Sequence, residues 1–260
     1  MKIWYQAYNT SARVDPKWRY YEEACERYIV KVARPDTQIH FAWLEKRAPK
    51  MLLSKYIQYM HLAEVIECAF EAERQGYDAF VLGGMRDLGH AELREALDIP
   101  VIFIGEVAYH MACMMAPKFS VIHNDEAALR AAGNIINSYG LGSRYIPGVQ
   151  LGYSQVDIME AFETKPENVA DEIKAAARTL IDKGAAILIP GFAAISVFLD
   201  ERGIRDIDGV PVMDCQSAAI KVAEMQVDMR RLGMSKPRLG PLYDVSKKDI
   251  QTARKIYGLE

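Results

Sequence analysis

Residues 79–89 read AFVLGGMRDLG, an uninterrupted apolar run that leads into a glycine-bearing turn. Residues 186–194 read AILIPGFAA and follow the same plan about a hundred positions later. An Ile-Pro-Val segment at 99–101 and a Val-Pro-Val segment at 210–212 come after the two runs. Apolar runs without polar alternation are typical of strands covered on both faces. The repeat therefore predicts two related halves whose strands end in matching turns, the first at residues 84–86 and the second at residues 191–193.

Strand-like and helical patterns alternate along the whole chain. Strands are expected at 2–8, 37–43, 77–82, 99–104, 119–123, 146–150, 186–189 and 210–213. Helices are expected after Asp15-Pro16, over 52–75 and 90–97, from Glu106, from Asp125 to Gly140, from Pro166 to Asp182, and from Ser217. This alternation predicts an α/β fold of two similar Rossmann-like parallel-sheet halves, related by a pseudo-twofold, with a ligand cleft between them. We assign residues 1–115 to the first half, completed by a C-terminal helix at about 217–260, and residues 116–216 to the second.

The bulk composition is that of a globular protein. The 260 residues carry a formal charge of −3, which gives no electrostatic footprint for nucleic acid or an anionic membrane. No signal-peptide pattern opens the sequence and no apolar segment has the length of a membrane span, so we expect a cytoplasmic protein. Four scattered cysteines indicate neither a zinc site nor a disulfide framework. No HExxH, P-loop or GxGxxG motif is present, so no metal and no cofactor is expected.

Several segments resemble one known family, in the same order along nearly the whole chain. They are Tyr8-Asn9-Thr10-Ser11, residues 78–89, Ile99-Pro100-Val101 with residues 105–110, Phe119-Ser120-Val121, and residues 210–214. Through them the chain resembles the aspartate/glutamate/hydantoin racemase superfamily, particularly its hydantoin-racemase-like branch. The resemblance implies a small carboxylate or cyclic amide or ureide as ligand, and a homo-oligomer.

This chain differs from the family at the two positions where catalytic cysteines are usual. Members of the family usually carry one cysteine at the end of each matched strand, and the two thiols exchange protons on opposite faces of a carbon next to a carbonyl. Those two positions read Gly84 and Phe192 here, and none of the four cysteines falls on either turn. The resemblance thus predicts a racemase-superfamily fold that lacks both usual catalytic cysteines.

The strand ends supply the candidate binding groups, because ligands of α/β sheets bind beyond the carboxyl ends of the strands. Hydroxyl and N–H groups after the first strand can hold a carboxylate or ureide carbonyl, and the alternative is an ordinary Asx or ST turn. The Arg86 guanidinium can bind an anion through bidentate hydrogen bonds, or it is simply exposed to solvent. Phe192 stacks on a planar ligand or belongs to the core. The candidates are Asn9, Thr10, Ser11, Gly84, Met85, Arg86, Gly191, Phe192 and Ala193.

Two residues are candidate catalysts. His123 closes a strand and carries a side chain suited to general acid or base work near neutral pH. Glu106 opens a helix, where the helix dipole favours a carboxylate. A structural role is the alternative for each. Asp87 and His90 form another acid–base candidate after the first turn, unless Asp87 caps the following helix.

These observations predict a cofactor-independent enzyme that acts on a small carboxylate or cyclic amide or ureide by acid–base chemistry without cysteine. Proton transfer on one face only favours ring-opening hydrolysis, lyase chemistry or one-sided isomerisation. A non-catalytic protein that binds or senses a small acid is one alternative. A racemase or isomerase with bases other than cysteine is another.

Overall fold

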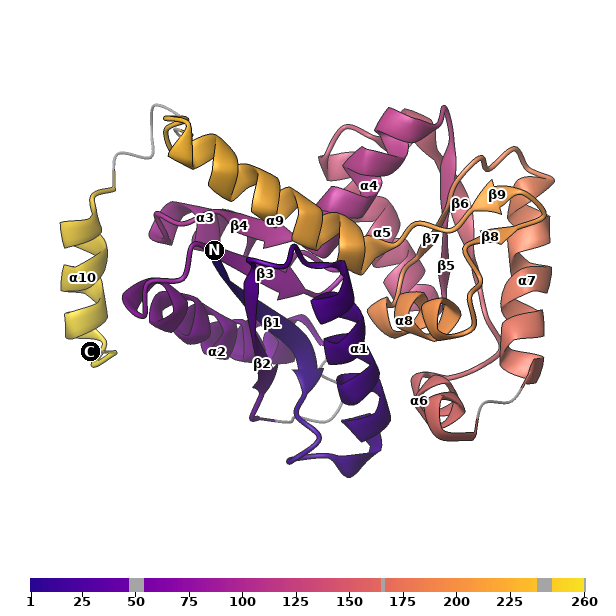
Figure 1. Cartoon of the computed structure of the whole chain (residues 1–260), viewed down its shortest axis with the longest axis horizontal. Coiled ribbons are helices and arrows are strands. Elements are labelled where there is room, and N and C mark those ends of the chain that lie inside the picture. Colours follow the sequence, from indigo (N-terminus) through magenta and orange to yellow (C-terminus); the bar gives the residue numbers. More distant parts are fainter. Residues whose placement is uncertain (47–53, 165–166, 238–244, 260) are drawn as a thin grey trace.

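The computed structural model describes residues 1–46, 54–164, 167–237 and 245–259. Two parallel sheets lie side by side and form the two halves (Figure 1). The first sheet has the order β2 (Gln38–Leu44), β1 (Lys2–Thr10), β3 (Ala79–Gly83), β4 (Val101–Phe103). The second has the order β6 (Tyr145–Gln150), β5 (Phe119–His123), β7 (Leu188–Pro190). The predicted α/β class with parallel-sheet halves is confirmed.

Helices follow the strands and cover both sheets (Figure 1). In the first half they are α1 (Arg19–Val32), preceded by the short η1 (Pro16–Trp18), then α2 (Lys55–Arg74), α3 (His90–Ala96) and α4 (Ile104–Met115). In the second they are α5 (Glu126–Ser138), η2 (Gly142–Arg144), α6 (Gln155–Thr164), α7 (Glu167–Ile181) and α8 (Ala193–Glu201). Last come α9 (Cys215–Arg231), which packs on α4 and β3, and α10 (Lys247–Ile256).

Burial explains why these strands read as continuous apolar runs. β1 is paired on both sides, with Tyr5 opposite Phe41 of β2 and Val81 of β3. Every residue of β1 after Lys2 is buried, as are all five residues of β3. One buried cluster extends from Tyr5 in the first sheet to Phe198 in α8. The two halves therefore share a hydrophobic core instead of resting on a polar interface.

The structure corrects several predicted elements. The C-terminal segment is two helices, because α9 ends at Arg231 and Gly233 follows with a positive φ of 101°. The last predicted strand is only Val210–Pro211, which pairs antiparallel with β8 (Asp206–Ile207), while Val212 alone bridges Leu188. Helices α6 and α8 were not predicted. Asp15 opens η1 without a side-chain cap.

Some predictions stay untested. The boundary between residues 115 and 116 falls between α4 and β5, and the division into domains stays a prediction. The expected helix start at 52 and the opening of a helix by Pro166 lie outside the described residues. Among the described ranges, no helix is long and apolar enough to cross a bilayer. The same ranges hold no group of three or more metal-binding side chains.

Candidate functional site

The first turn begins where β3 ends, directly beside Tyr8 of β1. A Cβ added to Gly84 would lie 3.0 Å from Cβ of Tyr8, which is closer than side chains normally approach. The absent side chain at Gly84 therefore lets Tyr8 occupy this strand end. The N–H groups of Gly84 and Met85 donate to no other residue of the described chain.

The second turn is built in the same way at the end of β7. The N–H of Gly191 donates to the carbonyl of Ile122 at 2.8 Å, which ties this turn to β5. A Cβ on Gly191 would lie 2.8 Å from Cδ2 of His123, so glycine is needed for the close approach. Phe192 is the N-cap residue of α8 and forms no side-chain cap. Within the described ranges, the N–H groups of Phe192 and Ala193 have no protein acceptor.

His123 lies at the end of β5, next to the second turn. Its ring centroid is 6.3 Å from that of Phe192. Burial and the nearby charge of Arg86 lower the pKa of His123 to about 4, against the opposing effect of Asp125. Nδ1 accepts a hydrogen bond from the N–H of Asp125 at 3.1 Å, so the proton of the neutral ring is assigned to Nε2. The His123 ring is therefore neutral at neutral pH and can donate a hydrogen bond through Nε2, and its expected acid–base role stays a prediction.

Arg86 extends from the first turn toward the second half. Burial lowers the pKa of its guanidinium, while Asp125 and Tyr8 act in the opposite direction. No ion pair or hydrogen bond joins the Arg86 guanidinium to another described residue. Asp125 uses its carboxylate to cap α5 by accepting from the N–H of Ala128 at 2.7 Å. Arg86 is thus a partly buried cation with no ion-pair partner among the described residues, and its charge reaches Asp125 and His123 of the second half.

Tyr8 is the site residue that sequence reasoning missed. Its side chain is buried, and its hydroxyl has no hydrogen-bond partner in the described part of the chain. Burial raises the pKa of Tyr8 to about 12, although the charge of Arg86 works against this, so the hydroxyl stays protonated. Its place two residues before the end of β1, next to Asn9, was the available signal. The structure thus brings together Tyr8 and Arg86 from the first half with His123 and Phe192 from the second.

Asn9, Thr10 and Ser11 are less available than expected. Asn9 and Thr10 belong to β1 itself, so the predicted turn begins only at Ser11. The side chain of Asn9 hydrogen-bonds Tyr21. The Ser11 hydroxyl accepts from the N–H of Arg13 at 3.2 Å, and the Ser11 N–H donates to the carbonyl of Leu44 at 2.8 Å. All three side chains are buried, and their role in binding stays a prediction.

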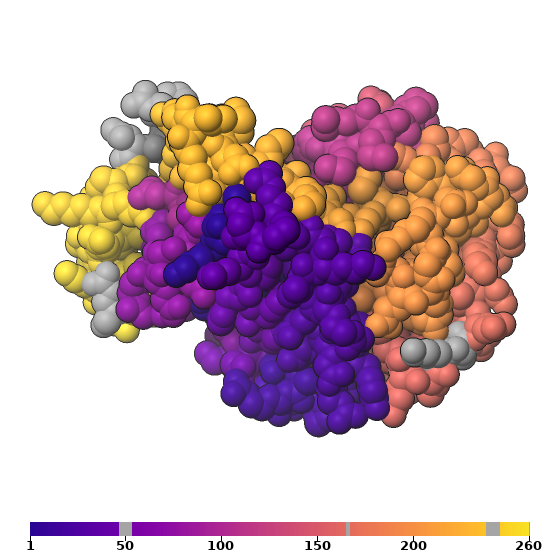
Figure 2. Space-filling model, in the orientation of Figure 1, coloured from indigo at the N-terminus to yellow at the C-terminus, as the bar shows by residue number. Residues whose placement is uncertain are grey.

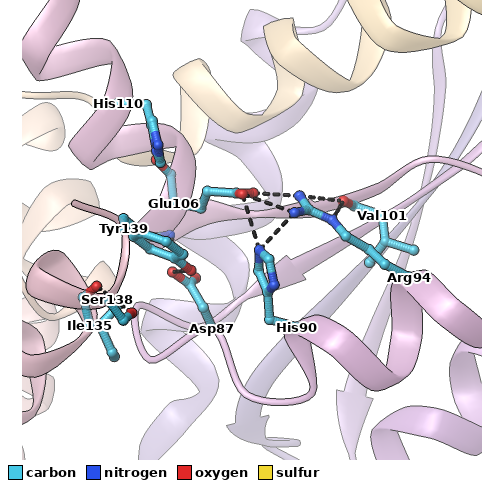
Figure 3. A network of polar contacts seen from close by, with 10 residues as sticks. Asp87, His90, Arg94, Val101, Glu106, His110, Ile135, Ser138 and Tyr139 are labelled. Carbon is cyan, nitrogen blue, oxygen red and sulfur yellow. Dashed lines mark hydrogen bonds and ion pairs between the residues drawn. The ribbon is translucent and has the colours of Figure 1, made fainter. Parts of the chain in front are cut away.

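Glu106 lies in a separate polar network (Figure 3). Burial works to raise the pKa of Glu106, but hydrogen bonds from His90 and Arg94 outweigh it and lower the pKa to about 2. The distance from His90 Nε2 to Glu106 Oε1 is 3.0 Å, and Arg94 forms an ion pair with the same carboxylate. A carboxylate held as an anion in this way is a poor proton acceptor. The structure does not bring Glu106 together with His123.

The cysteines lie away from the exposed parts of both turns. Cys215 is closest, because its Sγ is 3.9 Å from the carbonyl oxygen of Pro190, but it is completely buried at the start of α9. Burial raises the pKa of Cys215 far above its usual range, so this thiol does not ionise at neutral pH. Cys25 is buried in α1, while Cys68 and Cys113 are partly exposed on α2 and α4.

Two other regions of the described chain have charged groups that already have partners. The side chains of α1 and α8 meet on the face shown in Figure 2. Arg27 of α1 pairs with Glu201 of α8 at 3.0 Å. A cavity of about 560 Å³ is lined by residues of α3, α4 and α9. Its cations already have partners, since Arg94 pairs with Glu106 and Lys236 with Asp98. The Arg86–His123 region is therefore the candidate site.

The fold defines a class of two-sheet α/β proteins with glycine-bearing turns at the ends of β3 and β7. The chain belongs to the Asp/Glu/Hydantoin racemase family, whose model matches residues 19–223. It is 31% identical over 235 residues to the hydantoin racemase of Pseudomonas sp. (strain NS671), covering 90% of each chain. It is 27% identical over 183 residues to the hydantoin racemase of Paenarthrobacter aurescens, covering 70% of this chain and 75% of that protein.

Solved structures agree with this assignment of the fold. The allantoin racemase from Klebsiella pneumoniae superposes with a TM-score of 0.78 at 24% identity, covering 95% of this chain and 94% of the other. The allantoin racemase from Pseudomonas fluorescens gives a TM-score of 0.76 at 25% identity, covering 95% and 97%. The predicted superfamily and its hydantoin-racemase-like branch are confirmed. The absence of catalytic cysteines stays a prediction from the resemblance.

Proposed function

We propose that this chain is a cofactor-independent isomerase that exchanges the proton on the carbon next to a carbonyl in a small cyclic ureide of the hydantoin type. The observation that carries the proposal is the position of His123 beside the second turn, where its Nδ1 accepts from the N–H of Asp125 and Nε2 is left to donate. Within the described ranges, the N–H groups of Gly84, Met85, Phe192 and Ala193 have no protein acceptor. Removing such a proton leaves negative charge on the carbonyl oxygen. Fixed donors that face this oxygen lower the barrier.

A neutral imidazole suits this task better than a charged one. A histidine of low pKa can polarise a carbonyl as a hydrogen-bond donor without transferring a full charge to it. The low pKa of His123 has burial as its main cause, followed by the charge of Arg86. His123 is therefore proposed as an electrophilic donor. The N–H groups of the two turns are proposed to hold the remaining ring carbonyls.

Water is proposed as the group that exchanges the proton on carbon. Gly84 and Phe192 occupy the positions where thiols are expected, and Tyr8, with a pKa of about 12, is not a base at neutral pH. The bond from carbon to hydrogen breaks, the proton goes to a bound water, and the electron pair moves to the stabilised carbonyl oxygen. Return of a proton from water to either face of the planar intermediate gives racemisation. The racemase names of the relatives favour this reaction over ring-opening hydrolysis or lyase chemistry, which no observation supports specifically.

The test uses single enantiomers of 5-substituted hydantoins and of allantoin in D2O. We expect loss of the carbon-bound proton signal by NMR together with racemisation on a chiral column, both insensitive to iodoacetamide. His123→Gln should slow exchange on the order of 100-fold. His110→Gln, on the exposed side of α4, should leave the rate unchanged. Exchange abolished by iodoacetamide, or opening of the ring without exchange, would contradict the proposal.

A second candidate is a protein that binds a small ureide or acid without turning it over. Tyr8 stays protonated at neutral pH, and Nδ1 of His123 already accepts from the N–H of Asp125, which favours this candidate. In that case the same compounds raise the melting temperature of the protein, and no deuterium enters the ligand after prolonged incubation.

A further inference from the structure

Arg86 differs from two other partly buried arginines, Arg94 and Arg254, in having no carboxylate partner among the described residues. The Arg94 side chain, 27% exposed, pairs with Glu106, and the Arg254 side chain, 13% exposed, pairs with Glu67 at 2.7 Å. Arg86 pairs with no residue in the described ranges. A guanidinium removed from water without a carboxylate partner costs stability. An anion carried by a ligand would supply the missing partner of Arg86.

Tyr8 carries a second donor that has no partner among the described residues. The Tyr8 hydroxyl is buried, with the residue only 5% exposed, and it has no hydrogen-bond partner among the described residues. Tyr8 and Arg86 come from neighbouring strands β1 and β3, and each perturbs the ionisation of the other. A hydroxyl beside a guanidinium offers two or three donors to one planar group with two oxygens.

The surrounding charges leave room for one further anion. Asp125 is the acidic residue whose charge reaches both Arg86 and His123. Its carboxylate is committed to the first turn of α5, where it caps the helix and is stabilised by the helix N-terminus. The first turn of α8, on the other side of Phe192, carries no acidic residue.

We propose that Arg86 and Tyr8 bind a carboxylate carried by the substrate, so that the site takes cyclic ureides with an acidic side chain in preference to neutral ones. The expectation that the ligand contains a ureide ring rests on the proposed function, whereas the expectation that it carries a carboxylate does not. The planar fork of the guanidinium matches the two oxygens of a carboxylate, and a ring carbonyl offers only one. His123 and the N–H groups of the turns remain for the ring.

The experiment compares two ligands of the same shape, hydantoin-5-acetate and hydantoin-5-acetamide, by isothermal titration calorimetry. The wild-type protein should bind the acetate roughly 10- to 100-fold more tightly than the acetamide. Arg86→Gln should abolish this preference by weakening the acetate alone, and Arg86→Lys should restore only part of it. Tyr8→Phe should weaken the acetate by a smaller factor. The control Arg130→Gln removes an exposed arginine from α5 and should change neither affinity.

Three outcomes overturn the inference. They are equal affinity of the wild-type protein for both ligands, equal loss of both in Arg86→Gln, and unchanged binding of the acetate in that variant. Equal loss of affinity for both ligands would mean that Arg86 contacts the hydantoin ring and not the carboxylate. If neither hydantoin binds, the proposed function fails, and succinate becomes the probe of the carboxylate site. Binding of succinate that depends on Arg86 supports the inference even then, and absence of succinate binding overturns it.

Discussion

The hydroxyl of Tyr139, at the end of α5, donates a 2.9 Å hydrogen bond to Oδ2 of Asp87, in the loop that follows the first turn (Figure 3). Oδ1 of the same carboxylate accepts from the N–H of Gly105 in the first turn of α4 at 3.1 Å. Asp87 has a φ of 48°, a conformation that few residues except glycine and Asx adopt. These contacts join the loop after β3 to the end of α5 in the second half. Asp87 is the residue that follows Arg86.

The ionisation of Asp87 should make stability depend on pH. Burial raises the pKa of Asp87 to about 7, although the Tyr139 hydrogen bond works to lower it. In the unfolded chain its pKa is about 4. Between these values the folded state binds more protons than the unfolded state, so this group makes stability fall as pH rises from 4 to 7 and has no further effect above 7. Asp87→Asn should flatten the decrease in melting temperature between pH 5 and 8.

The control for this comparison is Asp171→Asn, which removes an exposed carboxylate from α7. Its melting temperature should follow that of the wild-type protein at every pH. Tyr139→Phe removes the bond that lowers the pKa of Asp87, so the transition should move to higher pH. A curve for Asp87→Asn parallel to the wild-type curve would show that Asp87 is not the titrating group.

The Glu106 network should contribute to stability and not to chemistry. Glu106→Gln leaves Arg94 and His90 without their anion, and we expect a loss of roughly 1–3 kcal/mol in the free energy of unfolding near pH 7. The pKa of Glu106 is lowered to about 2, so this contribution is present above the unfolded value near 4 and is lost as pH falls toward 2. Urea unfolding at pH 7 and pH 3 measures the difference.

The exposed pair Glu126–Arg130 supplies the control, because Glu126→Gln should cost well under 1 kcal/mol. Ligand affinity of Glu106→Gln, measured well below its melting temperature, should match that of the wild-type protein. A large change in proton exchange without a change in stability would return Glu106 to the list of catalytic candidates.

The sequence was sufficient for most of the fold, whereas the location of the site stays a prediction. Long apolar runs such as residues 79–83 can be stable only as covered strands, and their repetition predicted both halves. Helix α8 was missed because residues 193–199 are all buried, so the segment lacks the one-sided periodicity that marks a helix. Residues 210–213 resembled a strand in composition. Pro211, which has no N–H, limits their pairing to a short hairpin.

The chemistry of the site was harder to predict because it depends on contacts between the halves. His123 reads as a neutral-pH acid or base from its residue type, and only its burial beside Arg86 makes it a neutral donor. The missing partner of the Tyr8 hydroxyl likewise follows from packing around β1 and has no signature in the sequence. Glycine positions were informative, because the lack of a side chain at Gly84 and Gly191 is what allows the close approaches seen there.

Gly84→Ala tests the close contact between Gly84 and Tyr8. The new Cβ would lie 3.0 Å from Cβ of Tyr8, so the tyrosine must shift, at a cost of roughly 1–3 kcal/mol in stability. Because the hydroxyl moves with the ring, the affinity for hydantoin-5-acetate should fall several-fold relative to the wild-type protein. Gly133→Ala is the matched control, since its Cβ would meet Tyr145 at an ordinary 3.6 Å, and alanine favours the helix. Unchanged affinity in Gly84→Ala would mean that the position of Tyr8 is unimportant for binding.

The proximity of Arg86 and His123 across the junction can be measured directly. Since the charge of Arg86 is one cause of the low pKa of His123, Arg86→Gln should raise that pKa above about 4, while burial still keeps it below the usual value near 6.5. Because the unfolded chain binds this proton more readily, His123 should make stability increase with pH between 4 and 6.5, and the increase should be smaller in Arg86→Gln. NMR titration of the ring nitrogens reports both the pKa and the tautomer. An Nδ1–H tautomer at pH 7, or a pKa indifferent to Arg86, would remove His123 from its proposed role as a donor to the ligand.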